Sequence, residues 1–314
     1  MKVAVVIPAY KVRHQIIGVL NSIGAEVSSI FLVDDACPEE SGKLAKTSIA
    51  DPRLTVITHE KNMGVGGAVV TGYLAALEAG ADIVVKLDGD GQMNASLIPD
   101  LIQPILRGDA DYSKGNRFDS LTGLKSMPGA RVLGNGILSL MTKLSTGYWN
   151  ITDPTNGFTA LHKDLLRLIP LEMLSKRFFF ESDILFRLSL AKAVVWDVPM
   201  DAIYGSEKSN LRIAKVVFEF PIKHFVNFHK RLFYNYYLRD MSVGSIQLPV
   251  GLALGWFGFI FGILRWQDSL VTGEAATTGT VMLSAVPLIL GVQLVLGFLS
   301  QDINSIPTRT RHKR

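Results

Sequence analysis

Short apolar runs alternate with amphipathic stretches along the first third of the chain. The apolar runs begin at residues 3, 28, 54 and 81, and turn-forming or acidic residues follow each of them. Runs of this kind are typical of buried strands. Helical stretches lie between them, at residues 12–23, from residue 38, and from a glycine-rich turn near 64 to about 79. Strand and helix alternate through residue 107, which predicts a parallel α/β sheet with right-handed crossovers.

The middle of the chain is less regular. Strands are expected at residues 110–118 and 193–198, helices at 131–144 and from 178, and a short strand after the turn residues at 153–157. Polar and glycine residues between 120 and 129 predict a loop. The α/β region therefore extends to about residue 208, where the pattern changes.

Basic and aromatic residues are interleaved from residue 209 to 240. This pattern predicts one amphipathic helix, or two helices broken at Pro221, lying in a bilayer interface. The alternative is an ordinary amphipathic helix that covers the core of the domain. The apolar segments that follow favour the interface.

Two long apolar segments occupy the C-terminal part of the chain. Residues 244–264 and 280–300 contain no charged residue. Each segment is about 20 residues long, which is enough for a helix to cross the hydrocarbon core. We therefore predict a two-helix transmembrane hairpin within residues 241–303. Two buried core helices are the alternative, disfavoured because both would have to be apolar all round.

The flanking charges predict an orientation. Arg239 precedes the first span, the tail at 304–314 is basic, and the link between the spans carries Asp268 and Glu274 without lysine or arginine. The positive-inside rule then places the α/β region and both termini in the cytoplasm and the link outside. We expect the membrane to be the inner or plasma membrane of a prokaryote. Arg265 can snorkel at the far end. Small residues along the first span permit close helix contact and a homo-oligomer, although glycine is also simply tolerated there: Gly251, Gly255, Gly258 and Gly262.

Composition agrees with a membrane protein. Mean hydropathy is +0.28, and the apolar surplus lies in the C-terminal segments. The net charge of +4 is mild and concentrated in the last third, so a membrane surface is favoured as a partner over nucleic acid. The single cysteine, Cys37, excludes an internal disulfide and fits a reducing compartment. The chain starts directly with a strand, and we expect no signal peptide.

Two carboxylates follow the fourth apolar run. Asp88 and Asp90 are separated by one glycine, and at strand spacing residues two apart point the same way. Paired carboxylates suit a hard divalent cation, which in turn binds a diphosphate. The alternative is a solvated Asp-Gly turn.

The glycine-rich turn at residues 62–68 could alternatively be a dinucleotide-binding loop. That motif needs a third glycine at residue 69, where this chain has valine, and it normally follows the first strand rather than the third. A dehydrogenase is therefore disfavoured.

Taken together, four segments resemble a known family. Residues 6–10, 33–35, 62–68 and 88–92 have the order and spacing of family 2 glycosyltransferases with the GT-A fold. The sequence is most similar to the dolichol-phosphate mannose synthase type, which includes bacterial polyprenyl-phosphate glycosyltransferases with C-terminal membrane helices. The motifs cover about residues 1–210, and the architecture covers the rest.

The resemblance implies a donor site. It implies Mg²⁺ or Mn²⁺ on Asp88 and Asp90, with Asp90 acting in catalysis, and a UDP- or GDP-linked sugar as donor. Gln92 would touch the sugar or a metal-bound water, or is simply a turn residue. The nucleoside would be bound by Pro8, Tyr10, Asp34, Asp35, Lys61, Asn62 and Gly64, with Asp35 contacting the base.

The acceptor side leaves a mechanistic choice. A polyprenyl phosphate is already an anionic nucleophile, whereas a sugar hydroxyl would need a general base, for which Glu181 and Asp183 are the candidates. Arginine forks match phosphate oxygens, which makes Arg117 and Arg131 candidates for the acceptor phosphate. By resemblance, Asp153 and Asn156 would line the sugar pocket, and a basic segment with Lys208 and Arg212 would cover the diphosphate. An extra asparagine in that segment leaves open which of the two does so.

The sequence thus predicts a metal-dependent inverting transferase that moves a hexose or N-acetylhexosamine to a polyprenyl phosphate. One alternative is a transferase that extends a lipid-linked oligosaccharide or O-antigen. The other, from a different class, is a non-catalytic membrane scaffold that binds nucleotide sugars.

Overall fold

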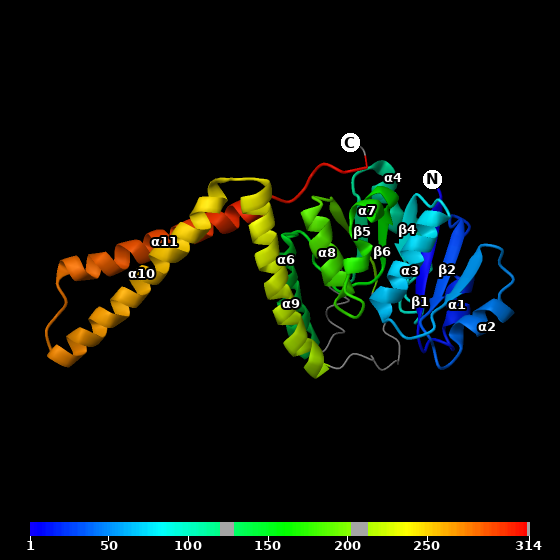
Figure 1. Cartoon of the computed structure of the whole chain (residues 1–314), viewed down its shortest axis with the longest axis horizontal. Helices are drawn as coiled ribbons and strands as arrows, with labels where there is room; N and C mark the ends of the chain where they lie inside the picture. Colours follow the sequence, from blue (N-terminus) through cyan, green and yellow to red (C-terminus); the bar gives the residue numbers. More distant parts are fainter. Residues whose placement is uncertain (120–128, 202–212, 313–314) are drawn as a thin grey trace. The chain divides into compact units, whose positions relative to one another are not determined.

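One mixed sheet forms the centre of the α/β part of the chain in the computed structural model, which describes residues 1–119, 129–201 and 213–312 (Figure 1). The strand order is β3-β2-β1-β4-β6-β5-β7. β6 runs antiparallel to β4 and β5, and the other neighbouring pairs are parallel. The predicted mostly parallel α/β sheet is therefore confirmed. The strands are β1 (Val3–Ala9), β2 (Ser29–Asp34), β3 (Leu54–Thr58), β4 (Ile83–Lys86), β5 (Tyr112–Asn116), β6 (Thr159–His162) and β7 (Val195–Pro199).

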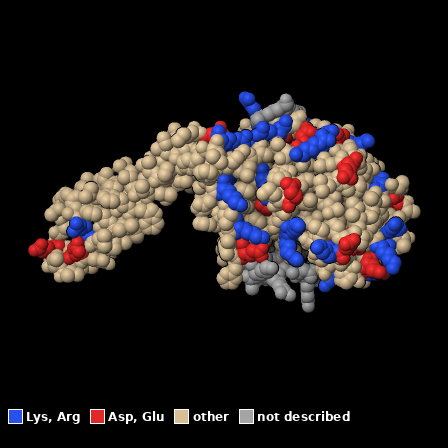
Figure 2. All heavy atoms as spheres, viewed as in Figure 1, with Lys and Arg blue, Asp and Glu red and all other residues tan. Residues whose placement is uncertain are grey.

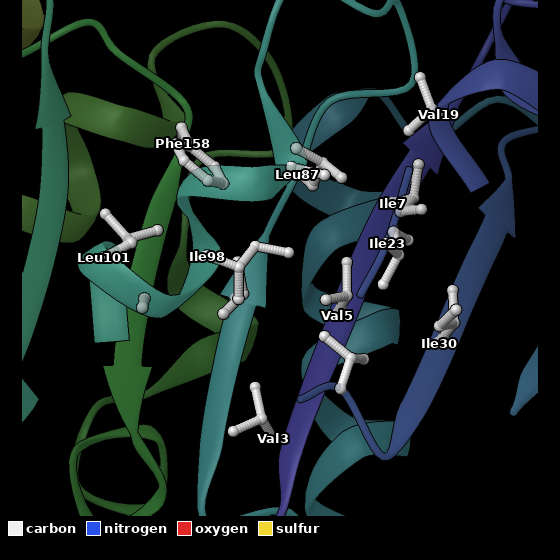
Figure 3. Packing of buried hydrophobic residues seen from close by; sticks show 14 of the residues in the cluster. Val3, Val5, Ile7, Val19, Ile23, Ile30, Leu87, Ile98, Leu101 and Phe158 are labelled. Carbon is white, nitrogen blue, oxygen red and sulfur yellow. The ribbon is translucent and has the colours of Figure 1, made fainter. Parts of the chain in front are cut away.

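Both faces of this sheet are covered. Successive residues of β1 point to opposite faces, so Val5 belongs to one apolar cluster (Figure 3) and Val6 to the other. A strand buried on both faces needs an uninterrupted apolar run, which is what the sequence shows. The helices of this unit are α1 (Ile16–Asn21), α2 (Ser41–Ser48), α3 (Val65–Glu78), α4 (Ile98–Arg107), α6 (Gly129–Thr146), α7 (Lys163–Leu168) and α8 (Phe180–Leu190), with 3₁₀ turns η1 (Ala95–Leu97) and η2 (Leu171–Met173).

The parallel strands direct their carboxyl ends to one edge of the sheet. Ala9 of β1 pairs with Asp34 of β2, and Val6 of β1 pairs with Lys86 of β4. The loops that follow β1, β2 and β4 therefore leave from the same edge. Ligands of open α/β sheets bind at this edge, so it is the place to look for the site.

The chain divides into two compact units. The first comprises Met1–Phe228 and Pro307–Arg314, and the second comprises His229–Ile306. The boundary falls within α9 (Ile213–Phe233), a single helix that contains Pro221. A π-helical segment, η3 (Tyr234–Arg239), follows it and precedes α10 (Val243–Thr272) and α11 (Thr278–Asn304).

In the second unit, α10 and α11 form an apolar hairpin. Both helices are long and apolar enough to cross a membrane, and only 11% of the most apolar window of each is buried. Because their apolar side chains are exposed, they are not core helices. Figure 2 shows few charges along the hairpin apart from a group at its tip, where the sequence has Arg265, Asp268 and Glu274.

Glycines allow the two hairpin helices to approach closely. A side chain at Gly251 would lie 3.0 Å from the carbonyl oxygen of Gly291, and Ser284 donates a hydrogen bond of 2.9 Å to the carbonyl oxygen of Gly258. The glycine spacing noted in the first span thus serves contact within one chain. At the base of the hairpin, Arg231 forms a buried ion pair of 2.7 Å with Asp302, which also accepts a hydrogen bond from Tyr236.

In the first unit, α9 covers part of the core. His224 lies 2.8 Å from the Ser145 hydroxyl of α6, and its ring contacts Phe179 edge-on at 5.0 Å. The opposite side of the helix exposes Phe218 and Phe225. One face therefore covers the core, while another presents apolar side chains outward.

Burial of His224 predicts a pH-dependent stability. Burial lowers the pKa of His224 to about 4, below its unfolded value near 6.5. The stability that depends on a neutral His224 is therefore fully present above pH 6.5. As the pH falls toward 4, the free energy of unfolding decreases by up to about 3 kcal/mol. Denaturant unfolding at pH 7 and pH 5 measures this loss, and His224→Phe should reduce it. Equal pH dependence in the wild type and the variant would contradict the assignment.

The segment after α11 returns to the first unit. Asp111, at the start of β5, accepts hydrogen bonds from the backbone N–H of Arg311 (2.7 Å) and from the ring of His312 (2.8 Å). The His312 ring also stacks on His162, with centroids 4.5 Å apart. The predicted basic tail therefore packs against the sheet near the start of β5. This edge is opposite to the one where the carboxyl ends of β1, β2 and β4 lie.

Loss of this attachment should destabilise the first unit. Deleting residues 309–314 removes charge-assisted hydrogen bonds to Asp111, each worth about 1.5–3 kcal/mol. We expect the thermal midpoint of the purified full-length protein to fall by several degrees. Deleting only residues 313–314 is the control. An unchanged midpoint in the longer deletion would show that the tail contributes nothing to the fold.

Candidate active site

The two predicted metal-binding carboxylates lie directly after β4. The turn that carries them is tight: Gly91 has φ of +75°, and the backbone N–H of Gln92 donates to Asp90 Oδ1 at 3.0 Å. Gln92 therefore takes part in the turn through its backbone. At Gly89 a side chain would lie 3.3 Å from the Pro8 carbonyl oxygen, so the loop after β1 borders this turn. The structure thus brings Pro8, Asp88, Asp90 and Gln92 to one edge.

A buried lysine lies beneath Asp88. Lys86 is the last residue of β4, and its side chain is 1% exposed. Its ammonium donates to Asp88 Oδ1 at 2.7 Å, to the Gly157 carbonyl oxygen at 3.2 Å and to Glu181 Oε1 at 3.3 Å. Burial disfavours its charge, but Asp88 and Glu181 outweigh this effect and raise the pKa of Lys86. Lys86 was not among the residues predicted from the sequence, although a lysine within an apolar strand indicates a buried charge that needs partners.

The two acidic residues at the start of α8 have different environments. Glu181 reaches Lys86, and burial together with the charge of Asp88 raises its pKa. Asp183 instead accepts the backbone N–H of Ser175 at 2.8 Å and lies 3.5 Å from Arg187. The structure therefore brings Glu181 to the Asp88 edge and uses Asp183 to hold the loop before α8. A base role for either residue stays a prediction.

Arg117 and Asp153 contact each other. The guanidinium forms a two-pronged interaction with the fully buried carboxylate, Nε to Oδ2 at 2.7 Å and Nη2 to Oδ1 at 2.9 Å. Burial would raise the pKa of Asp153, but Arg117 outweighs it and lowers that pKa. The neighbouring Lys114 donates to the Asp153 carbonyl oxygen, and burial lowers the pKa of Lys114 to about 8. Two residues expected on different substrates thus form one ion pair at the end of β5.

The acidic pair after β2 holds the surrounding loops. Asp34 accepts the backbone N–H groups of Cys37 (2.7 Å) and Gly42 (2.6 Å), which fixes the start of α2. Asp35 accepts the N–H groups of Met63 and Gly64, both at 2.7 Å. Its other neighbour is His59, whose Nδ1 lies 2.8 Å away and which the sequence analysis did not identify. Both carboxylates are buried, and their proposed contacts with a nucleoside stay predictions.

The glycine-rich turn is shaped by a neighbouring backbone. Gly64 has φ of +86°, and a side chain at Gly66 would collide with the Ser175 carbonyl oxygen. The backbone N–H of Gly67 donates to the Lys176 carbonyl oxygen at 3.2 Å. These glycines therefore allow the loop before α8 to lie against the start of α3. Asn62 adds a hydrogen bond of 3.2 Å to the Asp35 carbonyl oxygen.

The other predicted residues are scattered. Tyr10 is 39% exposed at the end of β1. Asn156 is buried and accepts the backbone N–H of Phe158 at 3.0 Å, as a turn residue does. Arg131 lies in α6, but its side chain is not among the described groups. Lys208 and Arg212 lie outside the described residues.

The carboxyl edge of the sheet suits a divalent cation that is bound partly by protein carboxylates and partly by a substrate. Asp88 and Asp90 offer carboxylate oxygens, and the Asp88 side chain is 29% exposed. Among the described residues no group of three or more His, Cys, Asp or Glu is arranged for a metal ion. Mg²⁺ commonly binds one or two carboxylates and completes its coordination with substrate phosphates and water. The donor set therefore suits a metal–diphosphate complex better than a metal held by protein alone.

Comparisons with known proteins identify the family. Residues 4–169 match the family model described as Glycosyl transferase family 2. The chain is 32% identical to the UDP-N-acetylglucosamine–dolichyl-phosphate N-acetylglucosaminyltransferase of Methanococcus voltae, over 69% of this chain and 91% of that protein. It is also 32% identical to the undecaprenyl-phosphate mannosyltransferase of Micrococcus luteus, over 64% of this chain and 83% of that protein.

A solved structure shares the fold. Glucosyl-3-phosphoglycerate synthase from Mycobacterium tuberculosis, in complex with Mn²⁺, UDP and phosphoglyceric acid, superposes with a TM-score of 0.54 at 18% identity. The alignment covers 73% of this chain and 78% of that one. The chain therefore belongs to glycosyl transferase family 2, with the GT-A fold, and is a nucleotide-sugar-dependent glycosyltransferase related to the dolichyl- and polyprenyl-phosphate enzymes.

Proposed function

We propose that this protein transfers one hexose or N-acetylhexosamine from a nucleotide diphosphate sugar to a polyprenyl phosphate, at the cytoplasmic face of a membrane. The observation that carries the proposal is the combination of an Asp88–Asp90 edge with an apolar hairpin of membrane-crossing length. Two relatives at 32% identity, whose names specify a dolichyl or undecaprenyl phosphate, support the same acceptor class.

The donor would bind along the edge formed by the loops after β1, β2 and β4. Asp88 and Asp90 would hold Mg²⁺ or Mn²⁺, which would offset negative charge on the leaving diphosphate. Tyr10 is exposed beside this edge and would contact the nucleoside. Asp34, Asp35 and Asn62 would shape the nucleoside site chiefly by holding its loops, as their hydrogen bonds indicate.

The transfer would be a single displacement. An oxygen of the acceptor phosphate attacks the anomeric carbon, the bond from that carbon to the diphosphate oxygen breaks, and the nucleoside diphosphate leaves with the electron pair. The configuration at the anomeric carbon is inverted. Because the attacking oxygen is already anionic, no side chain has to remove a proton from it. Arginine and lysine side chains are needed instead to hold two anionic groups together.

Several cationic residues are available for that task. Arg117 carries its charge at the end of β5, where its side chain is 29% exposed. We assign the acceptor phosphate to Arg117 and Arg131, and the diphosphate to Lys208 or Arg212. The hairpin would anchor the enzyme, and the exposed apolar residues of α9 would lie in the bilayer interface.

A donor panel tests the proposal. Purified full-length protein is incubated with undecaprenyl phosphate, Mn²⁺ or Mg²⁺ and a series of radiolabelled UDP- and GDP-sugars. We expect one donor to transfer label into the organic phase, and chelation of the metal to abolish the transfer. Label that never enters the organic phase, with metal-dependent nucleotide binding intact, would overturn the lipid-phosphate acceptor.

Substitution at the metal edge separates an enzyme from a scaffold. Asp88→Asn should lower kcat by at least about 100-fold, the scale of losing one electrostatic contact to a reacting group. Asp82→Asn is the matched control, since Asp82 precedes the same strand and pairs with Lys163 at the opposite end of the sheet. Equal activity of the Asp88 variant and the wild type would contradict the site. A wild type that binds nucleotide with metal but never turns over would indicate a scaffold.

The chemical lability of the product separates the two acceptor classes. A sugar attached to polyprenyl phosphate is released by mild acid, whereas a sugar–sugar bond survives it. We expect complete release of the label from the organic-phase product. Label retained on a lipid-linked oligosaccharide would favour the alternative in which Glu181 acts as general base, and Glu181→Gln would then abolish turnover.

A further inference from the structure

We propose that Lys86 is a positioning residue for glycosyl transfer: its buried ammonium holds the Asp88 carboxylate in the orientation that receives the metal–diphosphate, with Glu181 as its counterion. The proposal rests on the donor half of the proposed function, and its manganese-binding test is independent of the acceptor.

The ammonium of Lys86 has a complete set of acceptors. A lysine ammonium carries three N–H donors and no acceptor. Here the three acceptors are Asp88 Oδ1 at 2.7 Å, the Gly157 carbonyl oxygen at 3.2 Å and Glu181 Oε1 at 3.3 Å. These acceptors come from three segments: the turn after β4, the turn before β6 and the start of α8. With every donor engaged, both the position and the direction of the ammonium are determined.

This arrangement restricts Asp88. Lys86 and Asp88 are two residues apart at the end of β4, so their side chains leave on the same side. One carboxylate oxygen is held by a group that is 1% exposed, while the Asp88 side chain as a whole is 29% exposed. A carboxylate held in this way keeps its orientation before the ligand arrives. The cost of ordering it is met during folding rather than during binding.

Gly157 makes the arrangement dependent on a close backbone approach. A side chain at this position would collide with the Lys86 ammonium and would lie 2.8 Å from Asp88 Oδ2. The absence of a side chain lets the backbone of residue 157 lie against both groups. Gly157 therefore offers a way to disturb the contact without removing any charge.

Lys86 also lowers the negative charge at this edge. Asp88, Asp90 and Glu181 are three carboxylates, and the Lys86 ammonium is paired with two of them, Asp88 and Glu181. Its positive charge reduces the repulsion that a diphosphate would meet on binding beside these carboxylates.

A structural role and a positioning role predict different results in a double substitution. Lys86→Met alone leaves Glu181 buried without its cation, which should lower the thermal midpoint. Adding Glu181→Gln removes that unpaired charge, so the Lys86→Met/Glu181→Gln variant should recover most of the midpoint. It does not restore the contact to Asp88. We therefore expect kcat to stay at least about 10-fold below the Glu181→Gln single variant.

Manganese binding gives a readout that does not depend on turnover. Electron paramagnetic resonance measures free Mn²⁺ in titrations with the protein and UDP or GDP, whichever the wild type binds. We expect the affinity of the double variant for Mn²⁺ with nucleotide to fall at least about 10-fold relative to Glu181→Gln, because the contact that orients Asp88 is lost. Lys163→Met is the matched control, because Lys163 pairs with Asp82 at 2.5 Å at the other end of β4.

The outcomes separate the two proposals. If the double variant regains both the midpoint and Glu181→Gln levels of Mn²⁺ binding, Lys86 serves only to neutralise Glu181 and the inference is overturned. If the double variant does not fold, Lys86→Gln/Glu181→Gln decides, because it removes the ammonium but fills its place with a polar side chain: Mn²⁺ binding below that of Glu181→Gln supports the inference, and equal binding overturns it. A wild type that binds Mn²⁺ with nucleotide but never labels a lipid phosphate contradicts the proposed acceptor alone.

Discussion

Parallel strands that end at one edge of a sheet are the constraint on which the rest of this structure depends. β1, β2 and β4 are held in register by their ladders, so the loops after them leave together. Asp34 is the last residue of β2, Asp35 follows it, and Asp88 comes shortly after β4. Two of these acids hold neighbouring loops, and the third is partly exposed. The same edge therefore supplies both the rigid frame and the ligand-facing carboxylate.

The site is built on buried charge rather than on surface charge. Lys86 and Glu181 lie behind Asp88, and Arg117 is paired with the buried Asp153. Removing one partner of such pairs is costly because the other is left without compensation. These pairs link the strands to the start of α8 and to the turn before β6. An enzyme that binds an anionic nucleotide sugar gains from cations and carboxylates whose positions do not relax when the ligand arrives.

The periodicity of the sequence predicted the sheet, the hairpin and the Asp88–Asp90 turn because each depends on local pattern. Contacts between distant segments were not predictable in this way. Arg117 and Asp153 are separated by 36 residues, and Lys86 and Glu181 by 95. Glu181 and Asp183 were treated alike, yet two positions apart on a helix differ by about 200° in direction, so only one can face the site. The pattern of charges along the chain likewise did not predict the hydrogen bonds from Arg311 and His312 to Asp111.

The proposed reaction moves the sugar of a nucleotide sugar onto a lipid phosphate. Mass spectrometry of the organic-phase product, made from an unlabelled donor and undecaprenyl phosphate of defined length, tests it most directly. We expect a single species whose mass equals that of the lipid phosphate plus one sugar residue, that is, one sugar minus one water. A product in which the sugar is added to a saccharide, with the lipid phosphate unmodified, would contradict it.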